Sequence, residues 1–421
     1  MKTFRFIHAA DIHIDSPLRG FARYEGASAR FGAATRTAFA NLVDRAIEER
    51  VAFMVIAGDL YDGDWRDYNT GLFFAGQAGR LNEAGIPVFV LHGNHDAESQ
   101  ITRRLTLPDN VRVFGARQPE SFELDGLHVV LHGQSFAERE VRTNLVPAYP
   151  APVPGRFNIG VLHTALGGMG GHENYAPCAL EELLVKGYQY WALGHVHQAQ
   201  ILNERPHVVF PGVLQGRHIR ETGPKGAFLV NVEDGEVTAL EPLRTDVVRW
   251  ALLRIDVARA GRIEQALGLL RERIAAAVRA EADGRLLVCR LELHGQSAVH
   301  AALIADQERL LEEARAIALG LGEDVAWVEK LVVATGSALP PQVAAEQQDA
   351  LAELRRIVRD TDPELLDDIA RDVGELLRRV PHAVREDLEN PALQAALAGD
   401  YAPLAREATD YLLARLTTDV S

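Results

Sequence analysis

Three apolar segments in the first hundred residues each lead to a polar residue suited to binding a metal ion. They are residues 3–7, 53–57 and 88–91, followed by Asp11, Asp59 and Asn94. Near-continuous apolar runs of this length are typical of strands buried on both faces. Helical periodicity lies between them, over residues 39–47 and 72–84. This β-α-β-α-β alternation predicts a parallel sheet, so the three polar residues should share one edge of it.

Five short polar motifs follow one another through the first half of the chain, each where a predicted strand gives way to a loop. They are Asp11-Ile12-His13, Gly58-Asp59-Leu60-Tyr61-Asp62, Gly93-Asn94-His95-Asp96, His163-Thr164 and Gly194-His195-Val196-His197. One motif alone would be weak evidence, because a single histidine at a strand end is usually an ordinary polar residue. The ordered set predicts two adjacent divalent metal ions that bind a phosphate ester.

The pattern changes after residue 115 to short strands joined by turns. Segments 121–124 and 127–131 flank Asp125-Gly126, which is a strong signal for a two-residue hairpin. Further strands are predicted over residues 157–162, 190–193, 208–210, 227–232 and 237–240. We expect these strands to form a second sheet packed face to face on the first, with helices outside and the polar motifs meeting at one end.

The five motifs complete the pattern of calcineurin-type metallophosphoesterases, which is D-x-H, G-D-x-x-D, G-N-H-D/E, H and G-H-x-H. Within that superfamily the chain resembles the SbcD-type DNA-repair exonucleases, most closely a YhaO-like subgroup. The narrower resemblance depends on residues 10–17, 171–178 and 211–218 and covers residues 1–245. Two departures are Ile14-Asp15, where better-known members carry Leu-Gly, and Asp62, where some carry a second histidine. Both are compatible with an active centre and leave the nuclease polarity open.

The resemblance assigns a role to each motif residue. It implies that one metal is bound by Asp11, His13 and His197, that the other is bound by Asn94, His163 and His195, and that Asp59 bridges the two. A shared carboxylate holds two ions about 3.5–4 Å apart, so that a water between them loses a proton and attacks phosphorus in line. His95 would protonate the leaving oxygen or stabilise its charge, and Asp62 would orient its imidazole. Imidazole with carboxylate and amide oxygen suits Mn²⁺, with Fe²⁺ and Zn²⁺ as alternatives.

Substrate contacts are predicted in the loops of the subgroup segments. His172 and His218 lie in glycine-containing loops there. Each could contact the substrate or have a purely structural role, and the sequence leaves both alternatives open. Arg217 and Arg220 are expected to contact phosphate. The formal net charge of −15 predicts weak intrinsic affinity for DNA, because phosphate binding depends on Lys and Arg. The resemblance supplies a remedy, since it implies a partner of the SbcC kind, a coiled-coil ABC-type ATPase, and is compatible with a homodimer.

Composition favours a cytoplasmic protein. No apolar run approaches the roughly 20 residues that a membrane helix needs, and the first predicted strand leaves no room for a removable signal. Two cysteines, Cys178 and Cys289, occur in 421 residues. So few cysteines favour a reducing compartment without disulfides.

A change of periodicity divides the chain into three predicted parts. Residues 1–245 are the expected catalytic domain. Residues 246–339 alternate strand and helix, which predicts a small α/β capping domain with one helix over residues 298–317. Residues 340–421 follow a Pro-Pro linker and are predicted to be helical. Their apolar stripe packs on the chain itself or docks a partner, and comprises Leu366, Ile369, Val373, Leu376 and Val380.

The sequence therefore predicts an α/β two-metal phosphodiesterase that acts on DNA as an exonuclease or endonuclease. One alternative is a related enzyme that cleaves another phosphodiester or phosphomonoester, such as a cyclic nucleotide, a nucleotide-lipid or a phosphoprotein. The long extension after residue 245 argues against it, and a protein phosphatase should carry Arg-Gly where Gly63-Asp64 stands. The other alternative is a non-catalytic scaffold, which should have lost ligands; this chain has lost none.

Overall fold

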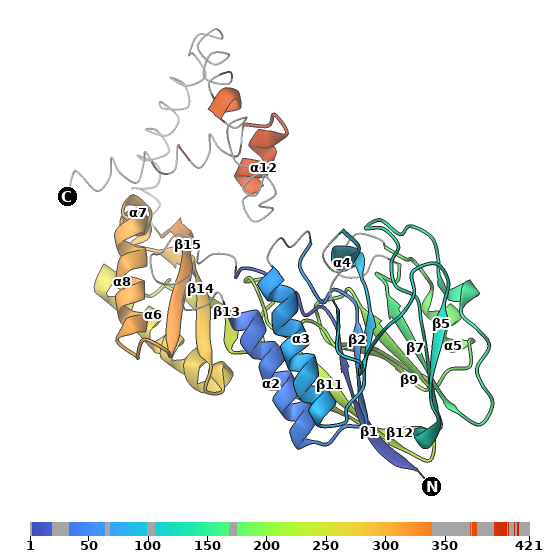
Figure 1. Cartoon of the computed structure of the whole chain (residues 1–421). Coiled ribbons are helices and arrows are strands. Elements are labelled where there is room, and N and C mark those ends of the chain that lie inside the picture. The colour runs from blue at the N-terminus through green and yellow to red at the C-terminus, as the bar shows by residue number, and fades with distance from the viewer. Residues whose placement is uncertain are drawn as a thin grey trace. The chain divides into compact units, whose positions relative to one another are not determined.

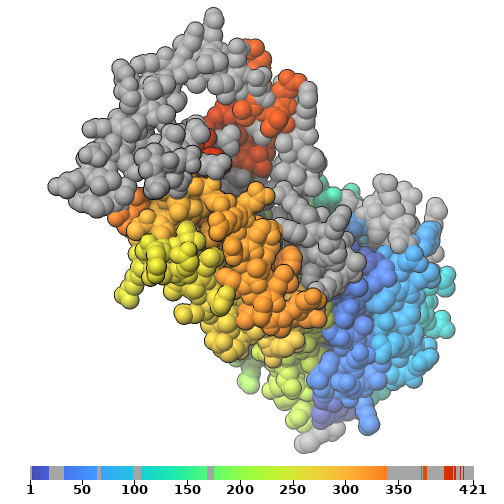
Figure 2. Space-filling view, turned by 90° about the vertical axis from the view of Figure 1, so that its left-hand side faces the viewer, coloured from blue at the N-terminus to red at the C-terminus, as the bar shows by residue number. Residues whose placement is uncertain are grey.

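The computed structural model describes residues 2–18, 33–63, 68–98, 106–167 and 175–338, with short stretches after residue 370. Those stretches are 371, 373–376, 391–401, 403, 408 and 411. The chain divides into two compact units. The first comprises Met1–Ala251 with Val278–Cys289, and the second comprises Leu252–Ala277 with Arg290–Ser421. In the space-filling view the described residues of the second unit are coloured from yellow through orange to red, and helices α2 and α3 of the first unit are blue (Figure 2).

The first sheet of unit one has the strand order β12-β11-β1-β2-β3-β4 (Figure 1). Its parallel strands are β1 (Thr3–Ala9), β2 (Phe53–Ala57), β3 (Val88–Leu91) and β4 (Val111–Val113). Helices α2 (Ala34–Glu48) and α3 (Tyr68–Glu83) follow β1 and β2 along the chain. Apolar residues of α2 such as Phe39 and Leu42 pack on Met54 and Ile56 of the sheet, as the helical periodicity predicted.

The second sheet has the order β5-β6-β7-β8-β10-β9. The strands are β5 (Glu120–Leu124), β6 (Val129–Gly133), β7 (Phe157–His163), β8 (Tyr190–Gly194), β9 (Gln200–Glu204) and β10 (His207–Phe210). The inner four run parallel, and β5 and β9 are antiparallel edges. Phenylalanines of the first sheet, including Phe6, Phe53 and Phe89, share one core with Leu131 and Val161 of the second. The predicted two-sheet α/β sandwich is confirmed.

Two strands that were predicted in the second sheet belong to the first. Strands β11 (Gly226–Glu233) and β12 (Glu236–Arg244) belong to the first sheet, where β11 pairs antiparallel with β1. Local periodicity identified both strands but could not reveal a partner that lies more than two hundred residues away along the chain. Their connecting turn, Asp234-Gly235, has φ values of 53° and 84°, as a type I′ hairpin requires.

The other Asp-Gly pair does not form the two-residue turn that was predicted. Leu124 pairs with Val129, so four residues connect β5 to β6, and they begin with a 3-10 turn over Asp125–Leu127. His128 closes the connection in the left-handed conformation, with φ 56°. The length of this four-residue connection corresponds to the register in which Leu124 pairs with Val129.

Unit two contains a three-stranded sheet of order β13-β14-β15 with helices packed on it. The strands are β13 (Val248–Asp256), β14 (Leu286–Ser297) and β15 (Ala326–Ser337), of which β13 and β14 begin in unit one. The helices are α6 (Ile263–Ala277), α7 (His300–Ala305) and α8 (Gln307–Leu319). A single helix was predicted where α7 and α8 occur. The helix is interrupted at Asp306, which is the N-cap of α8: its side chain accepts a hydrogen bond from the Arg309 amide.

The region after residue 338 is described in part. Helix α12 spans Pro391–Leu397. Of the predicted apolar stripe, Leu366, Ile369 and Val380 lie outside the described residues, whereas Leu376 is described and 69% exposed. Among the described residues, no helix is both long enough and apolar enough to cross a membrane.

Candidate metal centre

All seven predicted metal ligands meet where the strands of both sheets end. One group comprises Asp11, His13 and His197, and another comprises Asp59, His163 and His195; within each group the nearest donor atoms lie within 4.8 Å of one another. The Asn94 Oδ1 lies 3.0 Å from the His163 Nε2. Asp59 and His13 also form a group with His95. The convergence follows from the parallel order of β1, β2, β3, β7 and β8, which aligns their carboxyl ends.

Backbone strain accompanies this convergence. Asp11, His13 and Asp59 have φ values of 49°, 46° and 50°, and His195 has 98°. Left-handed conformations cost a non-glycine residue about 1–3 kcal/mol, so they persist only where neighbouring contacts impose them. Here the amides of Asp11 and His13 donate to the carbonyls of Gly58 and Asp59, each at 3.0 Å. The His195 amide donates to the Asp11 carboxylate at 2.9 Å, which joins the two sheets.

Asp96 fastens the Asp59 loop to the Asn94 loop. Its buried carboxylate accepts hydrogen bonds from the amides of Leu60, Tyr61 and Gly93 at 3.1, 2.8 and 3.0 Å. The bond from Gly93 caps helix α4 (Asn94–Glu98), and the other two position the backbone beside Asp59.

The imidazoles present their Nε2 atoms to the centre. The His163 Nδ1 lies 3.0 Å from the Ala57 carbonyl oxygen, and the His197 Nδ1 lies 2.6 Å from Glu221 Oε1. Because these oxygens accept, both Nδ1 atoms carry a proton, and Nε2 is the nitrogen of each ring that would bind a cation. Burial and the charge of Arg217 lower the pKa of His13 to about 3, so that its imidazole is neutral.

The charge of the cluster fits divalent cations. Asp11 and Asp59 are both buried, with 0% and 1% of their surface exposed. Burial raises the pKa of Asp11 to about 8, and the charge of Asp59 contributes to the increase. Burial alone would lower the pKa of His163, but the charges of Asp59 and Asp11, together with hydrogen bonds to Asp59 and to the Ala57 carbonyl, raise that pKa to about 9. Two buried carboxylates that attract positive charge, surrounded by imidazole and amide donors, form a suitable donor set for two metal ions.

The predicted pair of His95 and Asp62 lies beside this cluster. The His95 Nδ1 is 3.4 Å from Asp62 Oδ1, and the His95 side chain is 33% exposed. The same Asp62 oxygen lies 3.3 Å from the His13 Nδ1, without the geometry of a hydrogen bond. Burial would raise the pKa of Asp62, but His13 and Arg217 outweigh it and hold that pKa far below its usual range. Asp62 is therefore an anion shared between two imidazoles.

The predicted substrate contacts are distributed unevenly. The Arg217 guanidinium donates to Ser16 Oγ at 3.0 Å and lies 3.7 Å from Asp62, so it reaches the edge of the cluster. His218 is half-buried, and its Nε2 is 3.5 Å from Glu221. Arg220 is exposed, and its amide donates to the His218 Nδ1. His172 lies outside the described residues.

Glu221 was missed by the sequence analysis. It is 5% exposed, accepts from the His197 Nδ1, and accepts from the Arg217 amide at 2.6 Å. Burial would raise the pKa of Glu221, but the hydrogen bond from His197 and the charge of Arg217 hold it well below its usual value. The sequence signal that could have identified Glu221 is its spacing, four residues after Arg217 and three after His218, just beyond the segment 211–218.

Asp15 explains one departure from the family pattern. Its carboxylate accepts two hydrogen bonds from the Arg36 guanidinium, at 2.5 and 2.6 Å, and one from Thr70 Oγ1 at 2.5 Å. Arg36 belongs to α2 and Thr70 to α3. A glycine at this position could not tie the loop that carries Asp11 and His13 to both helices.

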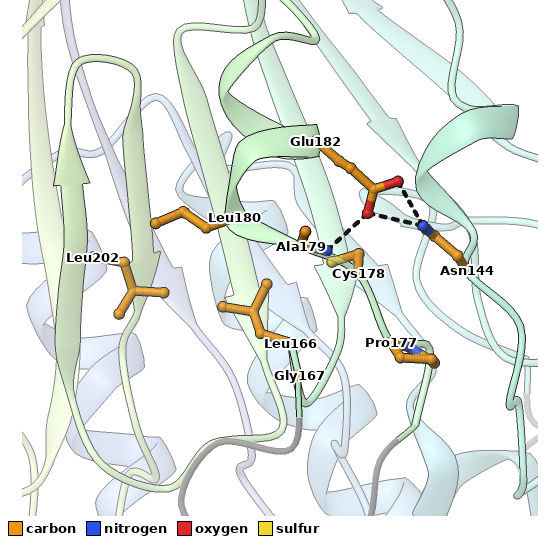
Figure 3. A pocket seen from close by; sticks show the side chains of 9 residues that line it. All are labelled: Asn144, Leu166, Gly167, Pro177, Cys178, Ala179, Leu180, Glu182 and Leu202. Atoms are coloured by element: carbon orange, nitrogen blue, oxygen red, sulfur yellow. Dashed lines mark hydrogen bonds between the residues drawn. The ribbon is translucent and has the colours of Figure 1, made fainter.

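A pocket of about 630 Å³ lies elsewhere in unit one, beside the loop after β7 (Figure 3). Its lining includes Leu166, Pro177, Leu180 and Leu202, and none of the seven ligands. Burial raises the pKa of the Cys178 thiol in its wall to about 11. A thiol in this state is a poor nucleophile.

Comparison with known proteins agrees with the fold and the site. Residues 4–199 match the calcineurin-like phosphoesterase family, and residues 250–336 match the middle domain of metallophosphoesterase YhaO. Residues 4–199 therefore form a calcineurin-like metallophosphoesterase domain, and that family consists of phosphoester hydrolases that use two divalent metals.

More particularly, the chain is 39% identical over 260 residues to the uncharacterised metallophosphoesterase YhaO of Bacillus subtilis, covering 61% of this chain and 64% of that protein. It is 23% identical over 231 residues to the DNA double-strand break repair protein Mre11 of Sulfurisphaera tokodaii, covering 52% and 58%. The chain thus spans less than two thirds of the length of either relative. A solved dimetal phosphatase of Danio rerio aligns with 58% of this chain and 98% of its own, at 13% identity and a TM-score of 0.36.

Proposed function

We propose that this metallophosphoesterase is a DNA nuclease that cleaves phosphodiester bonds with two Mn²⁺ ions. The observation that carries the proposal is the cluster of seven ligand-type side chains with His95 beside it. The choice of DNA is supported by relatives whose name is DNA double-strand break repair protein Mre11. Fe²⁺ and Zn²⁺ would suit the same donors, but a site with imidazole and carboxylate is ordinary for Mn²⁺.

Each residue has a defined part in this proposal. Asp11, His13 and His197 would hold one ion, Asn94, His163 and His195 would hold the other, and Asp59 would serve both. Ions bound there would polarise the phosphate and supply a water that ionises near neutral pH. His95 is exposed enough to reach a substrate and transfers a proton to the leaving oxygen, while Asp62 orients its imidazole. Arg217 and the more exposed Arg220 contact the phosphate in this proposal.

The test is cleavage by the purified protein after its metals have been exchanged for Mn²⁺. We expect it to shorten linear DNA and to cleave a bis-ester model substrate, and to act slowly on a phosphomonoester. Matched protein carrying Asp59→Asn, purified in parallel, controls for a contaminating nuclease. Hydrolysis of the monoester or of a cyclic nucleotide, with DNA left intact, would instead favour another metallophosphoesterase activity.

Partner binding forms a separate proposal. We propose that residues 1–245 are catalytic, that residues 246–339 act as a capping domain, and that residues 340–421 dock a coiled-coil ATPase. The exposed Leu376 supports docking, because it is a member of the apolar stripe. Leu376→Asp in the full chain should abolish co-purification with such an ATPase from the same organism. Leu319→Asp, at a position that is 45% exposed at the end of α8, is the control and should leave co-purification unchanged.

A further inference from the structure

The imidazoles of the two ligand groups have different partners at Nδ1. In the first group, the His197 Nδ1 donates to the Glu221 carboxylate at 2.6 Å, and the His13 Nδ1 lies 3.3 Å from the Asp62 carboxylate. In the second group, the His163 Nδ1 donates to a neutral backbone carbonyl, that of Ala57, at 3.0 Å. An anionic acceptor makes an imidazole more basic than a carbonyl does, so the two groups should bind cations unequally.

The contacts of Glu221 fix its carboxylate firmly beside His197. Oε2 accepts from the Arg217 amide at 2.6 Å, and Oε1 lies 3.6 Å from the Arg217 guanidinium. The His218 Nε2 is 3.5 Å from the same Oε1. Glu221 is buried, with 5% of its surface exposed, so water cannot readily replace any of these partners. The carboxylate thus has one orientation, and in that orientation it meets His197.

We propose that Glu221 is a positioning residue that strengthens one of the two metal sites, the one formed by Asp11, His13 and His197. It keeps the proton of His197 on Nδ1, turns Nε2 toward the metal, and increases the basicity of that nitrogen. In the other site, formed by Asn94, His163 and His195, the His163 Nδ1 meets the neutral Ala57 carbonyl instead. This inference rests on the proposed metal centre but not on the identity of the substrate.

Titration of the full-length protein with Mn²⁺ after chelator treatment tests the proposal. The wild-type protein should bind two equivalents. Glu221→Gln retains an acceptor for His197 but removes the charge, and should weaken one equivalent about tenfold. Glu221→Ala removes both and should weaken the same equivalent by about 10–100-fold. In each variant the other equivalent should keep its wild-type affinity, and the electron paramagnetic resonance signal of a coupled Mn²⁺ pair should require more Mn²⁺ to develop.

Glu182→Gln is the matched control. Glu182 is also a partly buried glutamate with several hydrogen bonds, from Asn144 at 2.9 and 3.0 Å and from the Ala179 amide at 2.7 Å, and it lies at the pocket away from the ligands (Figure 3). Both Mn²⁺ affinities should be unchanged in this variant. The thermal unfolding midpoint of every variant in chelator shows whether it is folded. Glu221→Gln is expected to fold even if Glu221→Ala does not.

Two results would overturn the role of Glu221. They are wild-type affinity at both sites in a folded Glu221→Gln protein, and equal weakening of both sites, which would show a general effect on the fold. A wild-type protein that binds fewer than two ions would refute the metal centre itself. Because the readout is metal binding, wild-type protein that binds two ions but cleaves no DNA would count against the proposed nuclease and not against Glu221.

Discussion

The Nε2 atoms of His13 and His197 lie 3.3 Å apart, although 184 residues separate them in the sequence. His13 follows β1 of the first sheet and His197 follows β8 of the second. The proton of His197 is held on Nδ1 by Glu221, and the His13 imidazole is neutral and has Asp62 close to its Nδ1. His197 therefore presents the lone pair of its Nε2 toward His13, and a cation beside these two rings and nearby Asp11 would be bound by it.

Asp59→Asn should remove metal and activity together. The substitution keeps the shape of the side chain but removes the charge from the residue proposed to touch both ions. The metal affinity of this variant should fall by more than the 10–100-fold that is typical when an outer-sphere partner of a ligand is removed. Elemental analysis of the purified protein, read beside a nuclease assay, measures both effects. Two ions retained at wild-type affinity would rule out a bridging role.

His95→Ala should separate turnover from metal binding. His95 is proposed to transfer a proton, not to hold a metal, so this variant should retain two ions. Its kcat should fall by about 10²–10⁴-fold, the usual contribution of a general acid. The same two assays check the result, with Asp59→Asn as the contrast. Cleavage of DNA at the wild-type rate would refute the assigned role.

The metal centre was more predictable from the sequence than its supports. Asp11, Asp59 and Asn94 could be placed together because the carboxyl ends of neighbouring parallel strands must coincide. Glu221 could not, since its partner His197 is 24 residues away and a glutamate in a loop has no periodic signal. The structural role of Asp15 likewise depends on its hydrogen bonds with Arg36 and Thr70, which lie on two helices whose packing could not be predicted from the sequence.

The limits for the fold have the same origin. Local patterns identified β11 and β12 as strands, but their sheet was wrong because pairing with β1 is a long-range event. The break between α7 and α8 was missed because a single Asp306 interrupts an otherwise helical run. Periodicity reports the burial of a face and carries little information about which element covers it.

Activity should depend on Mn²⁺ and be poor with Mg²⁺ alone. Four of the seven proposed ligands are imidazoles, whereas Mg²⁺ prefers oxygen ligands and gives up its waters reluctantly. Chelator should abolish cleavage, and added Mn²⁺ should restore it. Nuclease assays after exhaustive chelation and dialysis, with each metal added separately, make the comparison. Full activity in Mg²⁺ would contradict an imidazole-rich centre.

Gly93→Ala should disturb the centre through packing alone. A Cβ at position 93 would lie 2.3 Å from Asp59 Oδ1 and 2.8 Å from the His163 Nε2. Relief of this overlap must move a ligand, so the variant should bind Mn²⁺ more weakly and lose about 1–3 kcal/mol of unfolding free energy. Gly76→Ala is the control: a Cβ at this exposed site in α3 meets nothing within 4 Å.

That control has a definite expectation of its own. Alanine in a helix interior is favoured over glycine, so Gly76→Ala should raise the unfolding free energy by about 0.5–1 kcal/mol. Denaturant unfolding and Mn²⁺ titration of both variants give the two comparisons. Equal Mn²⁺ affinity in Gly93→Ala and Gly76→Ala would show that the centre tolerates the added methyl group.

His8 should make stability fall as the pH is lowered. Its side chain is fully buried: the Leu193 carbonyl accepts from Nε2–H at 3.1 Å, and Nδ1 accepts from the Tyr190 hydroxyl at 2.9 Å. Burial lowers the pKa of His8 from its usual value of 6.5 to about 3, although the bond to Leu193 opposes the shift. Between pH 6.5 and about 3, His8 is therefore protonated in the unfolded chain but neutral in the folded chain.

The sign of the pH effect follows directly. The contribution of neutral His8 is fully present above about pH 6.5, and below it the unfolding free energy falls by up to about 1.4 kcal/mol per pH unit until the folded pKa is reached. His8→Gln retains a donor and an acceptor but does not titrate, so it should flatten the curve between pH 6.5 and 4.5. Denaturant unfolding of both proteins in chelator, which removes metal release from the comparison, measures the difference. Parallel curves for the two proteins would mean that His8 is protonated in the fold or titrates equally in both states.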